Sequence, residues 1–427
     1  MGKSTLKTLI YSDLYPLPEN IGTRMRTMNF VRFFKKIGEV DLVYHRTGIE
    51  NNAGQGPFRN EYRIVKQGVS EGNENFSRVR DFTERIRRLA DRRPWIVADW
   101  PGTAIRELNS IVAGDQYDFV LCRYAQDSYP FLRYRGSLRK RIIVDFDDVL
   151  SASLFLSKVH RGPGLYAGWK WRLQWEMVSA YQRRFLTFGA ALFCSEEDRN
   201  EVTGSAGSPC AHLVPNTYPA SLDVRNADGS GYANRRTFLF VGALDYAPNI
   251  EGLKWFLRSI FPKVQEQYRD VRLLVAGRRP SRDLVFAIRE ITDVELHPDI
   301  PDIKALYERC GAVVVPLLSG GGTRIKILEA AMAGRFVLST PIGADGLSFG
   351  SEAGPGLFTD ERSFLGQYDK LEDGNYYREH VMKMHAAVQK TYSPEAFDRL
   401  MGKVVDSLLR EGMGRAVSPS PDGRSAR

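Results

Sequence analysis

Three consecutive glycines, residues 320–322, stand between a short apolar run and a segment whose apolar residues recur at helical spacing. The run 312–315 predicts a buried strand, and Ile325, Leu328 and Met332 predict one apolar face of a helix. Glycines remove every Cβ from the approach to such a loop, and the first N–H groups of a helix point outward with the positive end of its dipole behind them. Strand, glycine loop and helix start therefore predict a binding site for an anion such as a diphosphate.

The charged residues around this loop sharpen the prediction. Arg324 and Lys326 fall in the first helical turn, where a cation opposes the helix dipole by about 0.3–1 kcal/mol, and a bound diphosphate would reverse that penalty. Glu329 follows in an apolar setting, where an unpaired carboxylate is costly and a carboxylate accepting two hydrogen bonds from a ribose diol fits. The alternatives are that both cations extend into solvent while the glycines only shape a turn, and that Glu329 pairs with an arginine or with water.

Short apolar, β-rich runs alternate with amphipathic stretches along most of the chain, a pattern typical of parallel sheets with helical crossovers. In the first half the predicted strands are 5–11, 40–45, 62–65, 119–123, 141–146, 191–194 and 212–215. In the second half they are 237–241, 272–276, 294–297, 312–316 and 336–339. The polar stretch 221–236 is predicted to be an interdomain connection, 398–410 a closing helix, and 412–427 a disordered tail.

The chain has 427 residues, with 60 Lys and Arg against 51 Asp and Glu, and a formal net charge of +9. Hydrophobic and charged fractions of 43% and 26% exclude disordered, collagen-like and disulfide-scaffold proteins, and the length suits two or three domains. The four cysteines form no CxxC pair, which predicts reduced core thiols rather than a zinc site or disulfides. There is no run of about 18 apolar residues and no apolar signal-peptide core near the start, so we expect a cytoplasmic protein.

The glycine loop and its helix, 320–334, continued by 339–347, resemble the donor-binding region of the retaining glycosyltransferases of family four, the group 1 glycosyltransferases, in their triple-glycine subgroup. Further landmarks of that family occur in the right order. In the second half they are 240–249, 252–256, 274–278, 298–302 and 306–307. In the first half they are 14–18 with Gly22 and Arg26, then 144–148, 194–198 and 214–216. The resemblance covers roughly residues 5–410.

The resemblance implies the GT-B fold, an α/β architecture in which two Rossmann-like domains face each other across a cleft. On this basis we expect residues 1–218 to form an N-terminal acceptor domain and residues 219–392 to form a C-terminal nucleotide-sugar donor domain. Residues 393–411 are expected to form a helix that crosses back and packs on the N-terminal domain, with 412–427 as the tail.

The resemblance also implies an activity. It is the transfer of a sugar from a UDP- or GDP-sugar to a glycan or lipid-linked acceptor in cell-surface polysaccharide or glycoconjugate synthesis, with retention of anomeric configuration. The main catalytic need in such enzymes is stabilisation of the leaving diphosphate. By position, Arg324 and Lys326 are expected to meet it, with Asp147 as a third catalytic candidate, and Glu329 is expected to hold the ribose. The remaining donor-binding candidates are Gly22, Gly242, Asn249, Arg278, Gly321, Gly322 and Thr323.

Two departures from the family pattern bear on these assignments. The family carries two glutamates eight positions apart, and the first falls on Gly321 here, so the backbone amides of Gly322 and Thr323 are expected to hold the sugar hydroxyls. Many members place a histidine after an N-terminal-domain strand, where this chain has Phe146, Asp147 and Asp148. We expect no cofactor and no metal, with binding of Mg²⁺ by these two aspartates as the alternative.

A basic segment marks the expected acceptor domain. Seven arginines and three acids lie between residues 78 and 93, and a second stretch, 166–175, mixes aromatic residues with cations. Such segments suit peripheral contact with an anionic membrane, and the alternative is a solvated helix face over an ordinary aromatic core. The sequence contains no nucleic-acid-binding motif. The expected partners are therefore the sugar donor, the glycan or lipid-linked acceptor and the membrane surface.

Two other functions stay open at the level of sequence. A nucleotide-sugar epimerase can share this fold, and the replacement of the first family glutamate by Gly321 suits a non-catalytic partner that binds a sugar nucleotide. Acceptor-dependent transfer identifies a transferase, and donor isomerisation without acceptor identifies an epimerase.

Overall fold

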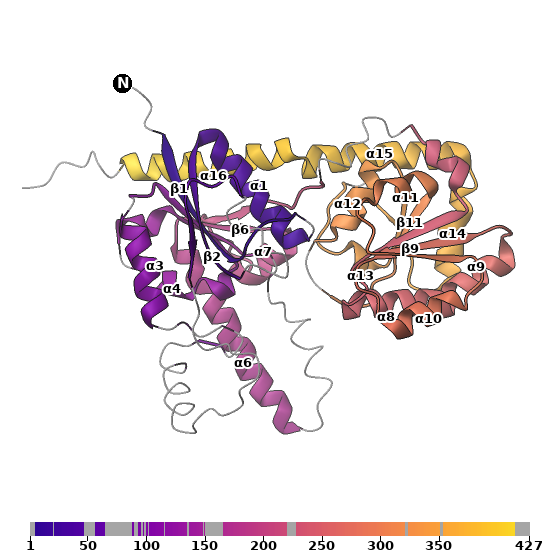
Figure 1. Cartoon of the computed structure of the whole chain (residues 1–427), viewed down its shortest axis with the longest axis horizontal. Helices are drawn as coiled ribbons and strands as arrows, with labels where there is room; N and C mark the ends of the chain where they lie inside the picture. Colours follow the sequence, from indigo (N-terminus) through magenta and orange to yellow (C-terminus); the bar gives the residue numbers. More distant parts are fainter. Residues whose placement is uncertain are drawn as a thin grey trace, which may run out of the picture. The chain divides into compact units, whose positions relative to one another are not determined.

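The chain divides into two units, each built on its own parallel sheet. One, here called unit 1, contains residues 1–214 and 398–427, and the other, unit 2, contains residues 215–397 (Figure 1). The computed structural model describes residues 5–19, 21–46, 56–64, 88, 93–94, 97, 100, 102–114, 116–134, 136–147, 149, 165–219, 228–320, 323–350 and 353–414.

Unit 1 is built on a seven-stranded parallel sheet with the order β3-β2-β1-β4-β5-β6-β7. The strands are β1 (Leu6–Leu14), β2 (Gly38–Arg46), β3 (Glu61–Arg63), β4 (Phe119–Arg123), β5 (Ile142–Asp145), β6 (Ala190–Phe193) and β7 (Ala211–Leu213). The helices are α1 (Gly22–Ile37), α3 (Gly102–Gly114), α4 (Tyr129–Leu132), α6 (Leu165–Arg183), α7 (Glu196–Thr203) and α16 (Pro394–Gly414), most of which belongs to this unit. Short 3₁₀ turns are η1 (Ala125–Asp127), η2 (Ser137–Arg141) and η3 (Arg184–Thr187).

Unit 2 is built on a six-stranded parallel sheet with the order β10-β9-β8-β11-β12-β13. The strands are β8 (Thr237–Val241), β9 (Arg272–Gly277), β10 (Val294–Pro298), β11 (Ala312–Val315), β12 (Phe336–Ser339) and β13 (Gly356–Leu357). The helices are α8 (Ala247–Trp255), α9 (Phe261–Gln267), α10 (Arg282–Arg289), α11 (Lys304–Arg309), α12 (Ile325–Met332), α13 (Pro341–Ala344), α14 (Glu361–Leu371) and α15 (Gly374–Tyr392). A 3₁₀ turn, η5 (Ser230–Asn234), precedes β8, and a π-helical turn, η6 (Phe256–Ile260), joins α8 to α9.

Both faces of the unit 2 sheet are buried. Side chains alternate along β8, so that Phe238 and Phe240 enter one core cluster and Leu239 enters another. The first cluster packs against α8, α9, α10 and α14, and the second against α11, α12 and the second half of α15. Figure 1 shows α8 and α10 on the opposite side of the sheet from α11 and α12. A parallel sheet covered on both faces leaves its edges as the places where a ligand can reach it.

The strand predictions are confirmed. Every strand predicted from the sequence is present, and the two-residue β13, too short to show a periodic pattern, is the described strand that the sequence did not predict. Unit 2 begins at Pro215, earlier than the expected 219, because Tyr218 packs in its core and its N–H donates to the Tyr392 carbonyl at 3.3 Å. The tail expected from 412 is wrong for its first residues, since α16 extends to Gly414 and periodicity alone fixes a helix end only to within a residue or two.

One glycine of α8 generates a test of this packing. A Cβ built on Gly252 would meet the Pro316 carbonyl oxygen at 2.3 Å, and backbone cannot yield as a flexible side chain does. We predict that Gly252→Ala lowers the free energy of unfolding by about 1–3 kcal/mol. The matched control is Gly366 in α14, where a Cβ meets nothing within 4 Å, so Gly366→Ala should raise that free energy by about 0.5–1 kcal/mol. Urea unfolding measures both, and effects of the same sign would contradict the packing argument.

Candidate functional site

The chemistry-bearing residues of unit 2 gather where its strand order reverses. The chain runs outward from β8 through β9 to β10, then returns to β11 beside β8 and runs outward the other way. In open parallel sheets, ligands bind outside the carboxyl ends of the strands at such a switch point. We use "switch-point site" for the residues that follow β8, β9 and β11 at this edge.

Glycines let the backbones at the switch-point site approach one another. A Cβ on Gly277, the last residue of β9, would lie 1.9 Å from the Gly242 carbonyl oxygen, and one on Gly242 would lie 2.8 Å from the Asn249 side chain. Gly320 has a φ of +111°, a conformation that side chains rarely adopt. The predicted site residue Gly242 therefore makes room for Asn249, and glycine is needed at these positions for geometric reasons.

Lys326 and Asn249, both predicted site residues, contact each other. The Lys326 Nζ donates a hydrogen bond to Asn249 Oδ1 at 2.9 Å, and Asn249 Nδ2 donates to the Ala243 carbonyl at 3.0 Å. The ammonium also lies 5.3 Å from the centre of the Phe240 ring. Asn249 is buried, so its amide holds the lysine in one direction at the end of β8.

Burial governs the charge of this lysine. It lowers the pKa of Lys326 to about 7, with the neighbouring Arg324 cation acting in the same direction and Glu329 acting against it. Arg324 itself is 8% exposed and occupies the position just before α12, so the alternative in which both cations extend into solvent is wrong. Ile325, expected on the apolar face of the helix, is only partly buried, because Ile327 takes the core position in its place.

Glu329 is held by a phenol. Its Oε2 accepts a hydrogen bond from the Tyr307 hydroxyl at 3.2 Å, and burial raises the pKa of the Glu329 carboxyl. Tyr307 comes from α11 and is fully buried. The sequence alternatives for Glu329, an arginine or water, did not include this partner. Among the described residues no hydrogen bond reaches the other carboxylate oxygen, Oε1, so it is available to a ligand.

The remaining predicted residues of unit 2 have different outcomes. Arg278 directly follows β9, is partly buried, and forms no ion pair with any described residue, whereas its neighbour Arg279 is paired with Asp245 at 2.7 Å. Thr323 is partly buried, and its carbonyl accepts from Ile325 N–H at 3.0 Å. Gly321 and Gly322 lie outside the described residues.

Thr340 is a structural residue of the site that the sequence analysis missed. Its hydroxyl donates to the Leu317 carbonyl at 2.5 Å and accepts from the Gly343 N–H at 3.0 Å, which ties the loop after β11 to the loop after β12. The available signal was the pair Thr340-Pro341, a side-chain cap followed by proline at the first helical position.

The predicted residues Gly22 and Asp147 belong to unit 1. Gly22 begins α1, and Asp147 lies two residues beyond β5. The Asp147 carboxylate accepts a hydrogen bond from Arg123 Nη2 at 2.9 Å and lies 3.7 Å from Arg26 Nε. Sequence reasoning missed Arg123, which ends the apolar strand run 119–123. Asp148, considered for Mg²⁺, lies outside the described residues.

Several other expectations have limited support. Over the part of the chain that is described, no cluster of three His, Cys, Asp or Glu has the arrangement of a metal site, and no helix is long and apolar enough to cross a bilayer. All four cysteines are free, as predicted. The basic segment 78–93 lies outside the described residues except for Arg88 and Arg93, and most side chains of 166–175 lie outside them too.

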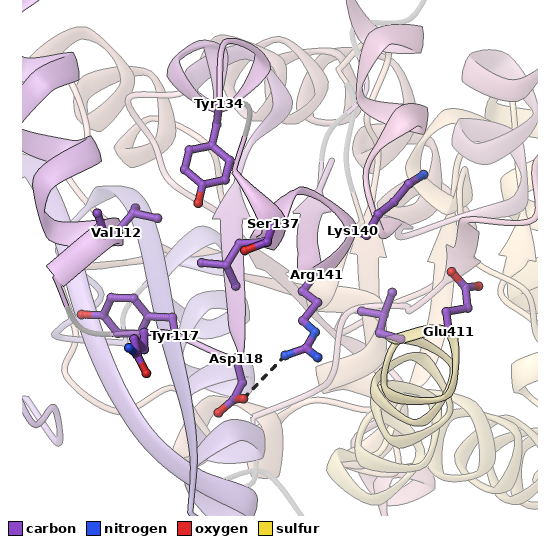
Figure 2. Close-up of a pocket in the computed structure, with 12 residues that line it drawn as sticks. Val112, Tyr117, Asp118, Tyr134, Ser137, Lys140, Arg141 and Glu411 are labelled. Atoms are coloured by element: carbon purple, nitrogen blue, oxygen red, sulfur yellow. Dashed lines mark ion pairs between the residues drawn. The ribbon is translucent and has the colours of Figure 1, made fainter. Parts of the chain in front are cut away.

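A cavity of about 730 Å³ opens at the amino edge of the unit 1 sheet (Figure 2). Its charges balance, since Lys140 and Arg141 share it with Asp118 and Glu411, and Arg141 Nη1 lies 3.7 Å from Asp118 Oδ1. Asp118 precedes β4 and Arg141 precedes β5, so the cavity lies at the opposite ends of the strands from Asp147. A neutral lining does not favour a diphosphate there.

Parts of the chain are similar in sequence to a known protein family and to one curated protein. Residues 235–365 match the family model described as "Glycosyl transferases group 1". An uncharacterized 44.6 kDa protein in the cps region of Klebsiella pneumoniae is 32% identical over 115 residues, which are 25% of this chain and 30% of that relative.

Solved structures resemble the chain over nearly its whole length. Sucrose-phosphate synthase from Thermosynechococcus elongatus gives a TM-score of 0.66 at 15% identity, with 95% of this chain and 100% of that chain covered. HepE of Anabaena in complex with UDP-glucose gives 0.64 at 12% identity, with 94% and 100% covered. Two parallel-sheet α/β domains of the GT-B class were expected, and that fold is confirmed.

The lowered pKa of Lys326 gives the site a pH signature. Between about 7 and the ordinary lysine value, the folded protein binds fewer protons than the unfolded chain, so this group makes stability rise with pH. We predict that ligand-free Lys326→Met is more stable than the parent near pH 6, and that the difference shrinks by roughly 2 kcal/mol towards about pH 9. Lys304→Met, which removes an exposed lysine of α11, is the control. Urea unfolding across this range decides, and a pH-independent difference for Lys326→Met would contradict the prediction.

Proposed function

We propose that this chain, which carries a group 1 glycosyltransferase domain, is a retaining glycosyltransferase that moves a sugar from a nucleotide-diphosphate sugar to a glycan or lipid-linked acceptor. The observation that carries the proposal is the set of cations at the switch-point site. Arg278 follows β9, and Arg324 and Lys326 follow the neighbouring loop after β11. Neither Arg278 nor Lys326 is ion-paired within the described chain, so their charge is available to a diphosphate.

The cations suit the leaving group of the reaction. The bond from the sugar C1 to the diphosphate oxygen breaks, a bond from the acceptor hydroxyl oxygen to C1 forms on the same face, and the hydroxyl proton passes to the leaving diphosphate. Negative charge builds on the diphosphate as its bond breaks, and preorganised cations in a partly buried site stabilise it. Lys326 is preorganised by Asn249, and an arriving diphosphate raises the pKa of Lys326 so that the bound lysine is charged.

Glu329 suits the ribose of the donor. Tyr307 holds one carboxylate oxygen and leaves Oε1 for a ligand. A ribose diol supplies two donors, and a carboxylate in a partly buried position gains more from them than it would in water. Glu329 and Lys326 lie on the same short helix, α12, and Arg324 lies at its start, so a nucleoside diphosphate can engage the carboxylate and these two cations together.

Proteins similar to this chain support the proposed classes of acceptor and donor. The cps-region protein of Klebsiella pneumoniae supports a role in cell-surface glycan synthesis, and HepE in complex with UDP-glucose supports a UDP-sugar as the first donor to test. The proposal includes peripheral contact with a membrane through the basic segment between residues 78 and 93, which rests on charge and spacing in the sequence.

Nucleotide binding is the first test. We predict that one nucleotide family among UDP, GDP, ADP and their sugars raises the melting temperature, since a ligand at about 100 times its dissociation constant adds roughly 2.7 kcal/mol. Lys326→Ala and Glu329→Ala should each weaken that affinity at least about tenfold, because each removes a charge-assisted contact. Glu308→Ala, an exposed glutamate on α11, should leave it unchanged.

The outcomes separate the candidate functions. Nucleoside diphosphate released together with a glycosylated acceptor supports the transferase. Isomerised donor formed without acceptor identifies an epimerase, and binding without any turnover identifies a non-catalytic partner. Unchanged affinity in both Lys326→Ala and Glu329→Ala would show that the switch-point site is not the nucleotide site.

A further inference from the structure

Two arginines and two aspartates form a buried cluster at the carboxyl edge of the unit 1 sheet. Arg26 comes from α1, Arg123 is the last residue of β4, Asp145 is the last residue of β5, and Asp147 follows two residues later. The side chains of the first three are fully buried, and that of Asp147 is 13% exposed. We call these residues the arginine–aspartate cluster.

The contacts within the cluster form a chain that ends at Asp147. Arg26 Nε donates to both Asp145 oxygens, at 2.9 and 3.1 Å, and Arg123 Nη1 pairs with the same carboxylate. Arg123 Nη2 then donates to Asp147 Oδ2 at 2.9 Å, while Asp147 Oδ1 lies 3.6 Å from the Cys194 thiol. Asp145 thus fixes both guanidiniums, and the guanidinium of Arg123 in turn fixes Asp147.

The backbone at Asp147 and at the neighbouring strand end has an unusual conformation. Asp147 has a φ of +49°, and Tyr124, directly after Arg123, has a φ of +64°, a region that non-glycine residues avoid. Tyr124 is held by its hydroxyl, which donates to Thr23 Oγ1 at 2.8 Å, and by its N–H, which donates to the Asp145 carbonyl at 3.0 Å. These contacts therefore hold Tyr124 and Asp147, after two adjacent strands, in strained backbone conformations. Such strain is common where a fold positions a functional group.

The place of the cluster in the fold favours a ligand-binding role. In the unit 1 sheet the strand order reverses between β1 and β4, and α1, which carries Arg26, follows β1. Ligands of parallel sheets bind at this kind of edge. A fully buried ion network is a poor way to gain stability, because its desolvation offsets its attraction. Asp147 is the one member of the cluster that solvent reaches.

We propose that Arg26, Arg123 and Asp145 are positioning residues that hold the Asp147 carboxylate to accept a hydrogen bond from the sugar acceptor's hydroxyl. The inference rests on the proposed transferase function and adds to it the residue that meets the acceptor. Burial acts to raise the pKa of Asp147, but the Arg123 and Arg26 guanidiniums outweigh it and hold that pKa below its ordinary value. The carboxylate is therefore ionised at neutral pH and orients the acceptor hydroxyl.

The competing role is purely structural, in which the cluster only fastens α1, β4 and β5 together. Asp147→Asn separates the two, because asparagine keeps the size of the side chain and one acceptor oxygen for Arg123 but loses the charge. The matched control is Asp118→Asn at the opposite edge of the same sheet. Asp118 accepts from the Lys7 N–H of β1 at 2.9 Å and lies beside Arg141, which directly precedes β5, so this substitution also changes contacts of the same sheet.

The experiment measures donor affinity and turnover in the full-length chain. Donor affinity comes from calorimetry with the nucleotide sugar that binds best, and turnover from nucleoside diphosphate release, with water and with methyl glycosides as acceptors. We expect Asp147→Asn to keep the donor dissociation constant within about twofold and to lower the release rate by about 10- to 100-fold. Arg123→Lys, which keeps the charge but loses the planar fork, should lower the rate by a smaller factor, with donor affinity again unchanged.

Other results would overturn the inference in distinguishable ways. An Asp147→Asn rate within about twofold of the parent, or a loss for Asp118→Asn equal to that for Asp147→Asn, makes the cluster structural only. A loss of donor affinity in Asp147→Asn would show that Asp147 contributes to donor binding instead of contacting the acceptor. If the parent chain itself releases no nucleoside diphosphate from any nucleotide sugar, the proposed function fails and this inference fails with it.

Discussion

The rest of this structure depends on the parallel pairing of its strands and on the burial of both faces of the unit 2 sheet. Each strand of the two sheets pairs in parallel with its neighbours, so the carboxyl ends within a sheet meet at one edge. Helices cover the faces of the unit 2 sheet, which leaves no room there for a polar ligand. The glycine-containing loops and the start of α12 in unit 2, and the ends of β4 and β5 in unit 1, therefore place the candidate site residues at the carboxyl edges.

The charged side chains at the carboxyl edges of the two sheets have different kinds of partner. In unit 1 each arginine of the cluster already pairs with an aspartate, so the arginine charges are balanced within the protein. In unit 2 the hydrogen-bond partner of Lys326 is a neutral amide and that of Glu329 is a neutral phenol, and neither side chain forms an ion pair within the described residues. A partly buried cation without a carboxylate partner is costly, as the lowered pKa of Lys326 shows, and an anionic ligand relieves that cost. This asymmetry supports the proposal that an anionic ligand binds at the switch-point site of unit 2.

The sequence predicted the sheets well because short apolar runs are local signals, and the glycine loop after β11 was visible for the same reason. Contacts between distant segments were not visible. Lys326 and Asn249 are 77 positions apart, and Arg26 and Asp145 are 119 apart, so no periodic pattern links them. Arg123 was overlooked at the end of an apolar strand run, and Tyr307 within a helix, although the family resemblance marked the segment of Tyr307. Element type thus follows from local pattern, whereas the partner of a buried charge follows from the fold.

Unit 1 is formed by two segments that are separated in the sequence by the whole of unit 2, and this affects the order in which the protein can fold during synthesis. Its last segment, beginning at Asp398, is synthesised only after all of unit 2, which runs from Pro215 to Phe397. Until α16 emerges, nothing covers the surface that its buried residues Met401, Val404, Val405 and Leu408 later occupy, including the position of Leu408 beside Gly189. An apolar surface left open on a nascent chain invites aggregation. Unit 2, which is continuous, can complete its sheet on the ribosome first, while unit 1 waits for its last helix.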